Sequence, residues 1–269
     1  MSARNVLTDR RREALALVAE YHYLTTPDFY ELLAAEGEHE RRGIRRMLML
    51  LARAGLVVRS RYTIDRPSDP FLRYQHCYRL SRAGREAVGR GQAAIEKSPA
   101  SLAHELGITA FHIALAKALP ATHRLYWRQT DLKRSVNPDA LFALTDTTKP
   151  RDGSTFYYFL EVERSRQGHY RGGESGLIAK LRRYADYRRS DQCRREWQHF
   201  SDFRVVVVLA NAERRENLLR ALGTRLPDRA IWTAAQEDIE RNVGGAIFYA
   251  PTDPNGHSLF ETTTGGTHV

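Results

Sequence analysis

The spacing of apolar and polar positions divides the chain into a helical first third and a longer region in which strands and helices alternate. Helices are predicted over residues 8–20, 26–33 and 38–54, followed by strands over residues 56–64 and 74–80. In the third helix, the apolar residues Ile44, Met47, Leu48 and Leu51 follow i, i+3, i+4, i+7 spacing and define one buried face. Three helices followed by a hairpin predict a winged helix-turn-helix domain.

The pattern changes after a linking helix over residues 81–90, and we place a domain boundary near residues 92–98. A long helix over residues 101–119 follows. Strands are then predicted over residues 124–128, 140–144, 157–163, 203–209, 231–233 and 246–249, and helices over residues 174–189, 213–222 and 236–242. This alternation predicts an α/β domain with a mixed sheet, and an α+β chain overall.

Three segments follow from these patterns. Residues 1–92 are expected to form the winged helix-turn-helix domain, and residues 98–250 the mixed-sheet α/β domain. Residues 246–249 are expected to be the last edge strand. The tail over residues 251–269 is rich in Thr, Gly and Pro, a composition typical of disorder.

Charge points to an anionic partner. The chain of 269 residues has a formal net charge of +10 and a sequence pI of about 9.8, which favours nucleic acid. Exposed basic side chains are expected at Arg41, Arg42, Arg45 and Arg46 on the third helix and at Arg59 and Arg61 in the wing. One interpretation places the third helix in the major groove of duplex DNA and the wing on phosphate. The alternative is a solvated basic face on a winged helix that binds protein.

A second basic stretch lies between Arg164 and Arg204, with 11 basic and 5 acidic residues, among them Arg182 and Arg183. The cysteines Cys77 and Cys193 show no metal-ligand spacing and indicate a reducing compartment. The N-terminus is polar and the longest strongly apolar run, residues 205–210, is too short to span a bilayer. These features predict a cytoplasmic protein with no membrane partner.

Carboxylates cluster at two predicted strand ends. Asp139 follows Pro138 at the start of one strand, and Glu161 and Glu163 end another, where alternation puts both on the same side. Pairing of these strands brings Asp139 beside Glu161. Buried carboxylates need a positive partner, and Mg²⁺ prefers such hard oxygen ligands. The alternatives are a turn role for Asp139, and solvated or arginine-paired carboxylates on an edge strand.

These residues resemble a known pattern. Pro138-Asp139 followed by Glu161-x-Glu163 resembles the PD-(D/E)xK signature of the restriction-endonuclease-like superfamily, although Glu163 stands where that signature has lysine. Lys180, on the next helix, is the candidate for a migrated equivalent. The order of the whole set, over about residues 8–250, resembles the replication-relaxation family of plasmids and integrative elements. The set comprises the winged helix, His104-Glu105-Leu106, Pro138-Asp139, Phe159-Leu160-Glu161-Val162-Glu163 and Lys180-Leu181-Arg182-Arg183-Tyr184.

The resemblance implies a restriction-endonuclease-like second domain and a site for metal-dependent DNA nicking. Asp139 and Glu161, with Glu163, would hold Mg²⁺ or Mn²⁺, and Lys180 would supply a positive charge to the phosphate. Glu105 is either a carboxylate lent to this site by the first helix or a surface residue.

The same resemblance implies a role in plasmid replication and in relaxation at transfer origins during conjugation. The expected partners are double-stranded DNA, a relaxase or replication initiator, and a second copy of the chain. Because the lysine of the signature is replaced by Glu163, two further interpretations stay open. One is an inactive nuclease fold that only binds DNA, and the other is a transcriptional repressor.

Overall fold

The computed structural model has two compact units, residues Met1–Ile113 and Ala114–Val269. It describes residues 7–33, 38–63, 74–89, 97–129, 134–150, 155–163, 176–198, 200 and 202–261. The units divide inside helix α5 (Pro99–Ala118), whereas the sequence predicted a boundary near residues 92–98. Most of that predicted linker lies outside the described residues.

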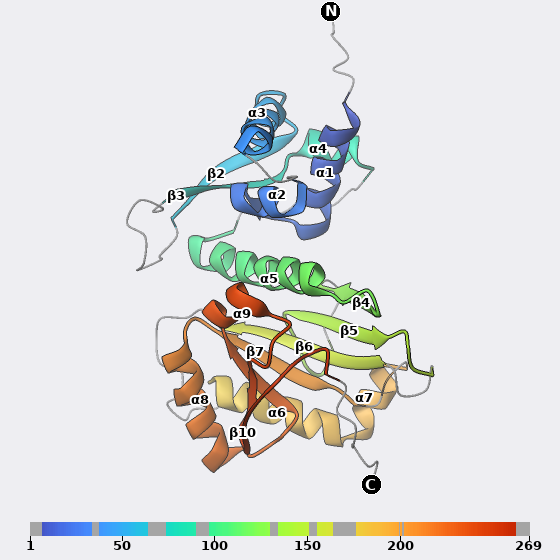
Figure 1. Cartoon of the computed structure of the whole chain (residues 1–269), viewed down its shortest axis with the longest axis vertical. Coiled ribbons are helices and arrows are strands. Elements are labelled where there is room, and N and C mark those ends of the chain that lie inside the picture. The colour runs from blue at the N-terminus through green and yellow to red at the C-terminus, as the bar shows by residue number, and fades with distance from the viewer. Residues whose placement is uncertain are drawn as a thin grey trace, which may run out of the picture. The chain divides into compact units, whose positions relative to one another are not determined.

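The first unit is a winged helix-turn-helix domain, as the apolar pattern predicted (Figure 1). Its elements before α5 are α1 (Asp9–Tyr21), β1 (Leu24–Thr25), α2 (Thr26–Leu33), α3 (Glu38–Arg53), β2 (Val57–Thr63), β3 (Tyr74–Leu80) and α4 (Arg82–Ala87). The strands form an antiparallel sheet in the order β1-β3-β2. The short strand β1 was not predicted, because two residues are too few for a periodic signal.

Local chemistry explains where the elements of this unit end. The Thr8 side chain accepts a hydrogen bond from the Arg11 amide at 3.4 Å and caps α1. Gly55 follows α3 with φ of +70°, a conformation that favours glycine. A side chain at position 84 would place Cβ 1.9 Å from the Leu56 carbonyl oxygen, so the close approach of α4 requires Gly84.

The N-terminal part of α5 packs within the first unit. Leu102 and Leu106 form a buried cluster with Tyr23 and Cys77. Further along the helix, the buried His112 ring lies 4.9 Å from the ring of Tyr21. These contacts explain why the first unit includes the helix as far as residue 113.

The second unit is an α/β domain built on a mixed sheet, as the alternation of strands and helices predicted. Its strands are β4 (His123–Arg128), β5 (Ala140–Asp146), β6 (Thr155–Glu163), β7 (Arg204–Leu209), β8 (Ile231–Ala235), β9 (Phe248–Ala250) and β10 (Asp253–His257). Its helices are α6 (Leu177–Arg189), α7 (Asp191–Glu196), α8 (Ala212–Arg225) and α9 (Gln236–Asn242). The sheet order is β10-β9-β8-β7-β6-β5-β4. Strands β6, β7 and β8 are parallel, and the other pairs are antiparallel.

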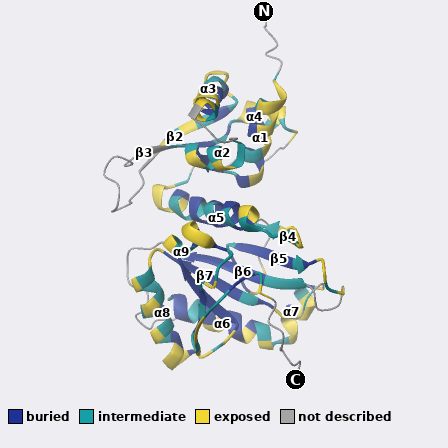
Figure 2. Ribbon diagram, in the orientation of Figure 1, coloured by how far each residue is buried: buried dark blue, intermediate teal, exposed yellow. Residues whose placement is uncertain are grey.

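The core of this unit lies between the central strands and the helices on one face of the sheet. Phe159 of β6 and Val207 of β7 are fully buried and belong to one cluster with Leu181 of α6 and Leu218 of α8. Figure 2 shows the central strands as the most deeply buried part of the unit. The run Val205–Leu209 is apolar at every position, as expected for a strand covered on both faces.

The C-terminal segment is ordered further than composition predicted. We expected disorder from Pro251 and a last edge strand over residues 246–249, but β9 pairs with β10, which is the edge. The His257 ring stacks on Trp232 at 4.9 Å, and Leu259 is buried. The prediction of disorder from the Thr-, Gly- and Pro-rich composition was therefore wrong for β10, which side-chain packing stabilises. Residues 262–269 lie outside the described residues.

The helices that the structure describes were compared with the length and hydrophobicity that a membrane span requires. In the part of the chain that the structure describes, every helix is too short or too polar to cross a bilayer.

Candidate functional site

The structure brings Asp139 and Glu161 together, as the strand pairing predicted. Ala140 pairs with Leu160 in the antiparallel β5–β6 ladder, so the preceding Asp139 stands across from Glu161 on the same face. The Asp139 amide donates to the Leu160 carbonyl at 3.0 Å. The Val162 amide donates to Asp139 Oδ2 at 2.7 Å, which fixes the direction of this carboxylate.

Helix α6 supplies hydrogen-bond donors to both oxygens of Glu161. The side chain of Glu161 is only 5% exposed, and Lys180 Nζ lies 2.5 Å from its Oε2 atom. The hydroxyl of the buried Tyr184 donates to Oε1. Lys180 and Tyr184 are separated by one helical turn, so both reach the same strand end. Lys180 therefore lies beside the carboxylates, and its role as a migrated lysine stays a prediction.

Burial and a neighbouring like charge oppose ionisation of Glu161. Burial raises the pKa of Glu161 to about 7, and the charge of Asp139 adds to this effect. The ammonium of Lys180 and the hydrogen bonds from Lys180 and Tyr184 act in the opposite direction. The pKa of Tyr184 is raised by burial and by Glu161, so its hydroxyl stays protonated and acts as a donor.

The other predicted carboxylates do not complete a larger metal site. Glu163 lies on the same side of β6 as Glu161 but is half-buried, two residues beyond it. Among the residues that the structure describes, no three His, Cys, Asp or Glu side chains are grouped to bind one metal ion. The predicted triad of Asp139, Glu161 and Glu163 is therefore not formed.

Glu105 has a local partner in the first unit. Its carboxylate forms an ion pair with Lys97, which lies just before α5, and its side chain is 15% exposed. This contact accounts for the position of Glu105 without a role in catalysis. The suggestion that it lends a carboxylate to the site stays a prediction.

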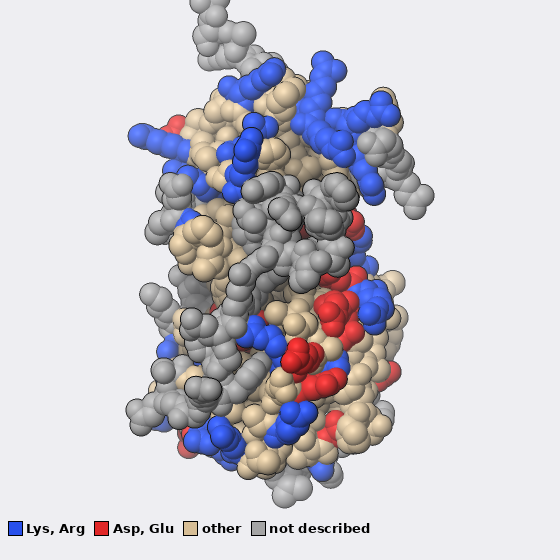
Figure 3. All heavy atoms as spheres, turned by 90° about the vertical axis from the view of Figure 1, so that its left-hand side faces the viewer, with Lys and Arg blue, Asp and Glu red and all other residues tan. Residues whose placement is uncertain are grey.

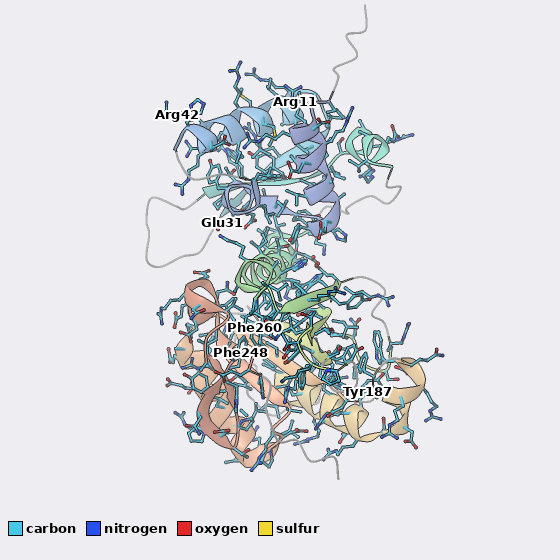
Figure 4. All side chains as sticks on the ribbon, turned by 45° about the vertical axis from the view of Figure 1, so that its right-hand side comes forward. Arg11, Glu31, Arg42, Tyr187, Phe248 and Phe260 are labelled. Atoms are coloured by element: carbon cyan, nitrogen blue, oxygen red, sulfur yellow. The ribbon has the colours of Figure 1, made fainter. Side chains whose placement is uncertain are left out.

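The arginines of α3 are exposed, as the sequence predicted. Arg41, Arg42, Arg45 and Arg46 all lie on the side opposite the buried face of this helix. The guanidinium carbons of Arg41 and Arg45 lie 5.7 and 5.6 Å from the centre of the Tyr30 ring. Arg45 also donates to the Tyr30 hydroxyl. Figure 3 shows basic side chains gathered on this unit, and Figure 4 labels Arg42 on α3.

Two wing arginines continue the basic surface within the first unit. Arg59 and Arg61 alternate along β2 and are exposed. His76, which pairs with Arg61 across the hairpin, has a pKa lowered by burial and by these two arginines. The predicted wing tip, residues 65–70, lies outside the described residues.

The second predicted basic stretch is only partly described. Arg182 and Arg183 are exposed on α6, whereas its buried side carries Leu181 and Tyr184. The glycine-containing segment over residues 164–175 lies outside the described residues. The helix therefore presents basic groups to solvent and directs Lys180 to the carboxylates.

Tyr184 belongs to the candidate site, but the sequence did not identify it as a partner of Glu161. Residue spacing alone predicted that Tyr184 and Tyr187 both lie on the same side of the helix as Lys180. Spacing did not distinguish the two tyrosines, because Tyr187 donates instead to Glu196 at 2.8 Å. The contact of Tyr184 with Glu161 depends on how α6 packs on the sheet.

The fold and site define a winged-helix protein whose second unit has a mixed sheet with two carboxylates and a lysine at one strand end. The sequence profile of the replication-relaxation family matches residues 15–202, and the chain belongs to this family. No curated protein matches the chain.

Solved structures give weaker likenesses. A mutant of MarR from E. coli is 19% identical, with 43% of this chain and 68% of that chain covered and a TM-score of 0.24. PadR of Bacillus subtilis in complex with operator DNA is 16% identical, with 41% and 72% covered and a TM-score of 0.24. Restriction endonuclease FokI is 12% identical, with 86% and 44% covered and a TM-score of 0.29. At these scores the fold rests on its own strand order and pairing.

Proposed function

We propose that this chain is a DNA-binding protein of a mobile element that acts in plasmid replication and relaxation and nicks DNA in a metal-dependent reaction. The observation that carries the proposal is the placement of Asp139, Glu161 and Lys180 around one end of β6. Paired carboxylates beside a lysine suit phosphodiester cleavage, because they combine a cation site with a positive charge for the phosphate.

The chemistry of the donors fits a hard divalent ion. Asp139 and Glu161 offer carboxylate oxygens, and Mg²⁺ is commonly bound through one or two carboxylates together with substrate phosphates. Bound Mg²⁺ or Mn²⁺ would activate a water and neutralise charge on the phosphate. Within the chain, the Val162 amide orients Asp139 and Tyr184 orients Glu161. Lys180, which is 34% exposed, can reach a phosphate oxygen in place of Glu161.

DNA binding is assigned to the first unit. The four exposed arginines of α3 and the two of β2 form the basic surface that a winged helix presents to a duplex. PadR, one of the weak structural likenesses, is seen with operator DNA. A relaxase or replication initiator, or a second copy of this chain, is the further partner we propose for action at an origin.

A second candidate is a DNA-binding accessory protein or repressor that does not cleave. The observation that favours it is that both oxygens of the buried Glu161 already accept hydrogen bonds from Lys180 and Tyr184. Such a network satisfies the carboxylate without any metal ion. In this case the second unit would stabilise an assembly or hold DNA.

The test is a cleavage assay on supercoiled and linear DNA with Mg²⁺, Mn²⁺ or EDTA. Nicking that needs the metal and is lost in Asp139→Ala supports the nuclease. If supercoiled DNA stays intact with every metal while duplex binding persists, the accessory role holds. Repression of a promoter by the Asp139→Ala protein at the wild-type level would further support the repressor.

A further inference from the structure

The edge strand β4 carries an exposed aromatic side chain between two arginines. Arg124, Tyr126 and Arg128 are alternate residues of β4, so their side chains leave the same face of the sheet. Tyr126 is 52% exposed, and every other large hydrophobic side chain whose burial the structure describes is more deeply buried. We call these three residues the β4 strip.

The pairing register places the β4 strip on the face that carries the carboxylates. Arg128 pairs with Leu141 of β5, and Leu141 pairs with Phe159 of β6. Asp139 lies two residues before Leu141 and therefore shares its face. Arg128 is the last paired residue of β4, and Asp139 directly precedes β5, so both lie at the same end of this strand pair. The strip thus begins beside the candidate active site and runs away from it along the edge.

Protection of the sheet edge accounts for only part of this arrangement. Charged side chains on an edge strand discourage pairing with another chain, which explains Arg124 and Arg128. An exposed tyrosine does the opposite, because it adds apolar area to an open edge. A single exposed tyrosine needs no explanation by itself, but a ring with an arginine two residues away on each side combines the stacking surface and the positive charge that bind single-stranded nucleic acid.

We propose that the β4 strip binds a single-stranded segment of DNA that leads to the carboxylate site. A base stacks on Tyr126, and phosphates about two nucleotides away in each direction along the strand contact Arg124 and Arg128. The two arginines are about 14 Å apart along the strand, which matches roughly four nucleotides at the stacked rise of a DNA strand. This inference rests on the proposed function, because it assigns a strand-holding surface to the same site.

Binding can be measured without cleavage, so the two proposals fail separately. The full-length protein is titrated in EDTA with a fluorescent oligothymidylate of about 16 nucleotides, and anisotropy gives Kd. Tyr126→Ala is expected to weaken binding about 5- to 30-fold, in the range found when one stacking ring is removed. Tyr126→Phe, which keeps the ring, is expected to stay within about twofold of wild type.

Matched variants separate the strip from general charge. Arg124→Ala should weaken oligothymidylate binding and lower its salt dependence, whereas Arg220→Ala, an exposed arginine of α8, should change neither. Duplex binding should be unchanged in Tyr126→Ala, and its thermal melting should confirm the fold.

The proposal is overturned if wild type does not bind the oligonucleotide, or if Tyr126→Ala binds it as wild type does. Equal losses of affinity in Tyr126→Ala and Tyr126→Phe would also overturn it, because stacking would not be the cause. If the protein binds the oligonucleotide but does not nick DNA, the proposed nuclease function is wrong, while the proposed binding of single-stranded DNA by the β4 strip is supported.

Discussion

The charged groups of the two units differ in how they meet solvent. On α3 the four arginines are exposed, and their nearest aromatic partner, Tyr30, leaves them accessible. In the second unit, the carboxylate of Glu161 is buried, and it accepts hydrogen bonds from Lys180 and Tyr184. Exposed charges act additively and are screened by salt, whereas buried charges act as a unit.

This difference has a consequence for what each region can do. A screened basic surface can attract any phosphate backbone, but it cannot place one phosphate with the accuracy that a reaction requires. The cluster around Glu161 has the opposite properties, because two donors from α6 and one amide from β6 fix its carboxylates. Changes to the cluster should therefore affect turnover, and changes to α3 should affect affinity.

The largest effect is expected for Lys180→Ala. If the site cleaves DNA, this change should reduce the nicking rate by ~10²-fold or more, the range found when one charge partner of the transition state is removed. Lys180→Arg should keep only part of the activity, because a planar guanidinium replaces a compact ammonium. Gel-based nicking of supercoiled plasmid measures both rates.

Lys149→Ala is the matched control for Lys180. Lys149 also pairs with a carboxylate, Asp146, at 3.5 Å and has a similar exposed fraction, 36% against 34% for Lys180. The Lys149→Ala protein should cleave as the wild type does. Lys149→Ala, Lys180→Ala and Lys180→Arg should all bind duplex DNA with equal affinity. If Lys180→Ala nicks DNA at the wild-type rate, Lys180 has no part in cleavage. The distinction between a cluster that sets turnover and an α3 surface that sets affinity would then fail.

The next effect concerns metal binding. Calorimetry should detect Mn²⁺ binding to the wild type and its loss in Glu161→Gln, because the amide removes an anionic ligand while keeping the shape of the side chain. Glu196→Gln is a suitable control, since Glu196 is also hydrogen-bonded to a tyrosine hydroxyl, that of Tyr187. Equal Mn²⁺ binding in all three proteins would show that the carboxylates are structural.

A smaller effect is expected on α3. Replacing Arg45 and Arg46 with Ala should weaken duplex binding by about 1–3 kcal/mol for each arginine that hydrogen-bonds a base, or flatten the salt dependence where an arginine binds phosphate. Anisotropy at several salt concentrations distinguishes these results. Arg220→Ala controls for net charge. If Arg45 and Arg46 prove unnecessary for duplex binding, the winged helix is better explained as a protein-binding domain.

The smallest effect is a pH dependence of stability. The pKa of Glu161 is raised from 4.5 to about 7, so the folded state keeps a proton that the unfolded state loses. This stabilisation is complete below pH 4.5 and is lost as pH rises through 7. The difference in unfolding free energy between wild type and Glu161→Gln should therefore change by on the order of 2 kcal/mol over this window. Urea unfolding at several pH values measures it, and a constant difference would contradict the assigned cause.

Much of this arrangement could be predicted because it follows from strand periodicity. A proline before Asp139 marked the start of one strand, and the apolar run before Glu161 marked another, so pairing placed the two acids together. The helix bearing Lys180 was predicted from its amphipathic spacing, although it begins three residues later than expected, at Leu177.

The rest depended on tertiary packing that periodicity does not encode. The role of Tyr184 arises from the way α6 lies on the sheet, which selects it over Tyr187. The edge strand β10 was missed because the ring of its last residue, His257, stacks on the distant Trp232, a contact that no local pattern encodes. Composition predicted disorder there, and packing decided otherwise.

Because Lys180 and Tyr184 belong to one helix, the ionisation of Glu161 reports whether α6 is docked. Leu181 lies between these two residues in the sequence. It is fully buried and packs in the core, which holds α6 against the sheet. If α6 opened locally, both donors would leave Glu161 together while the rest of the sheet stayed folded. The carboxylate cluster would then come apart before any global unfolding is seen, and hydrogen exchange of the α6 amides would measure how often this opening occurs.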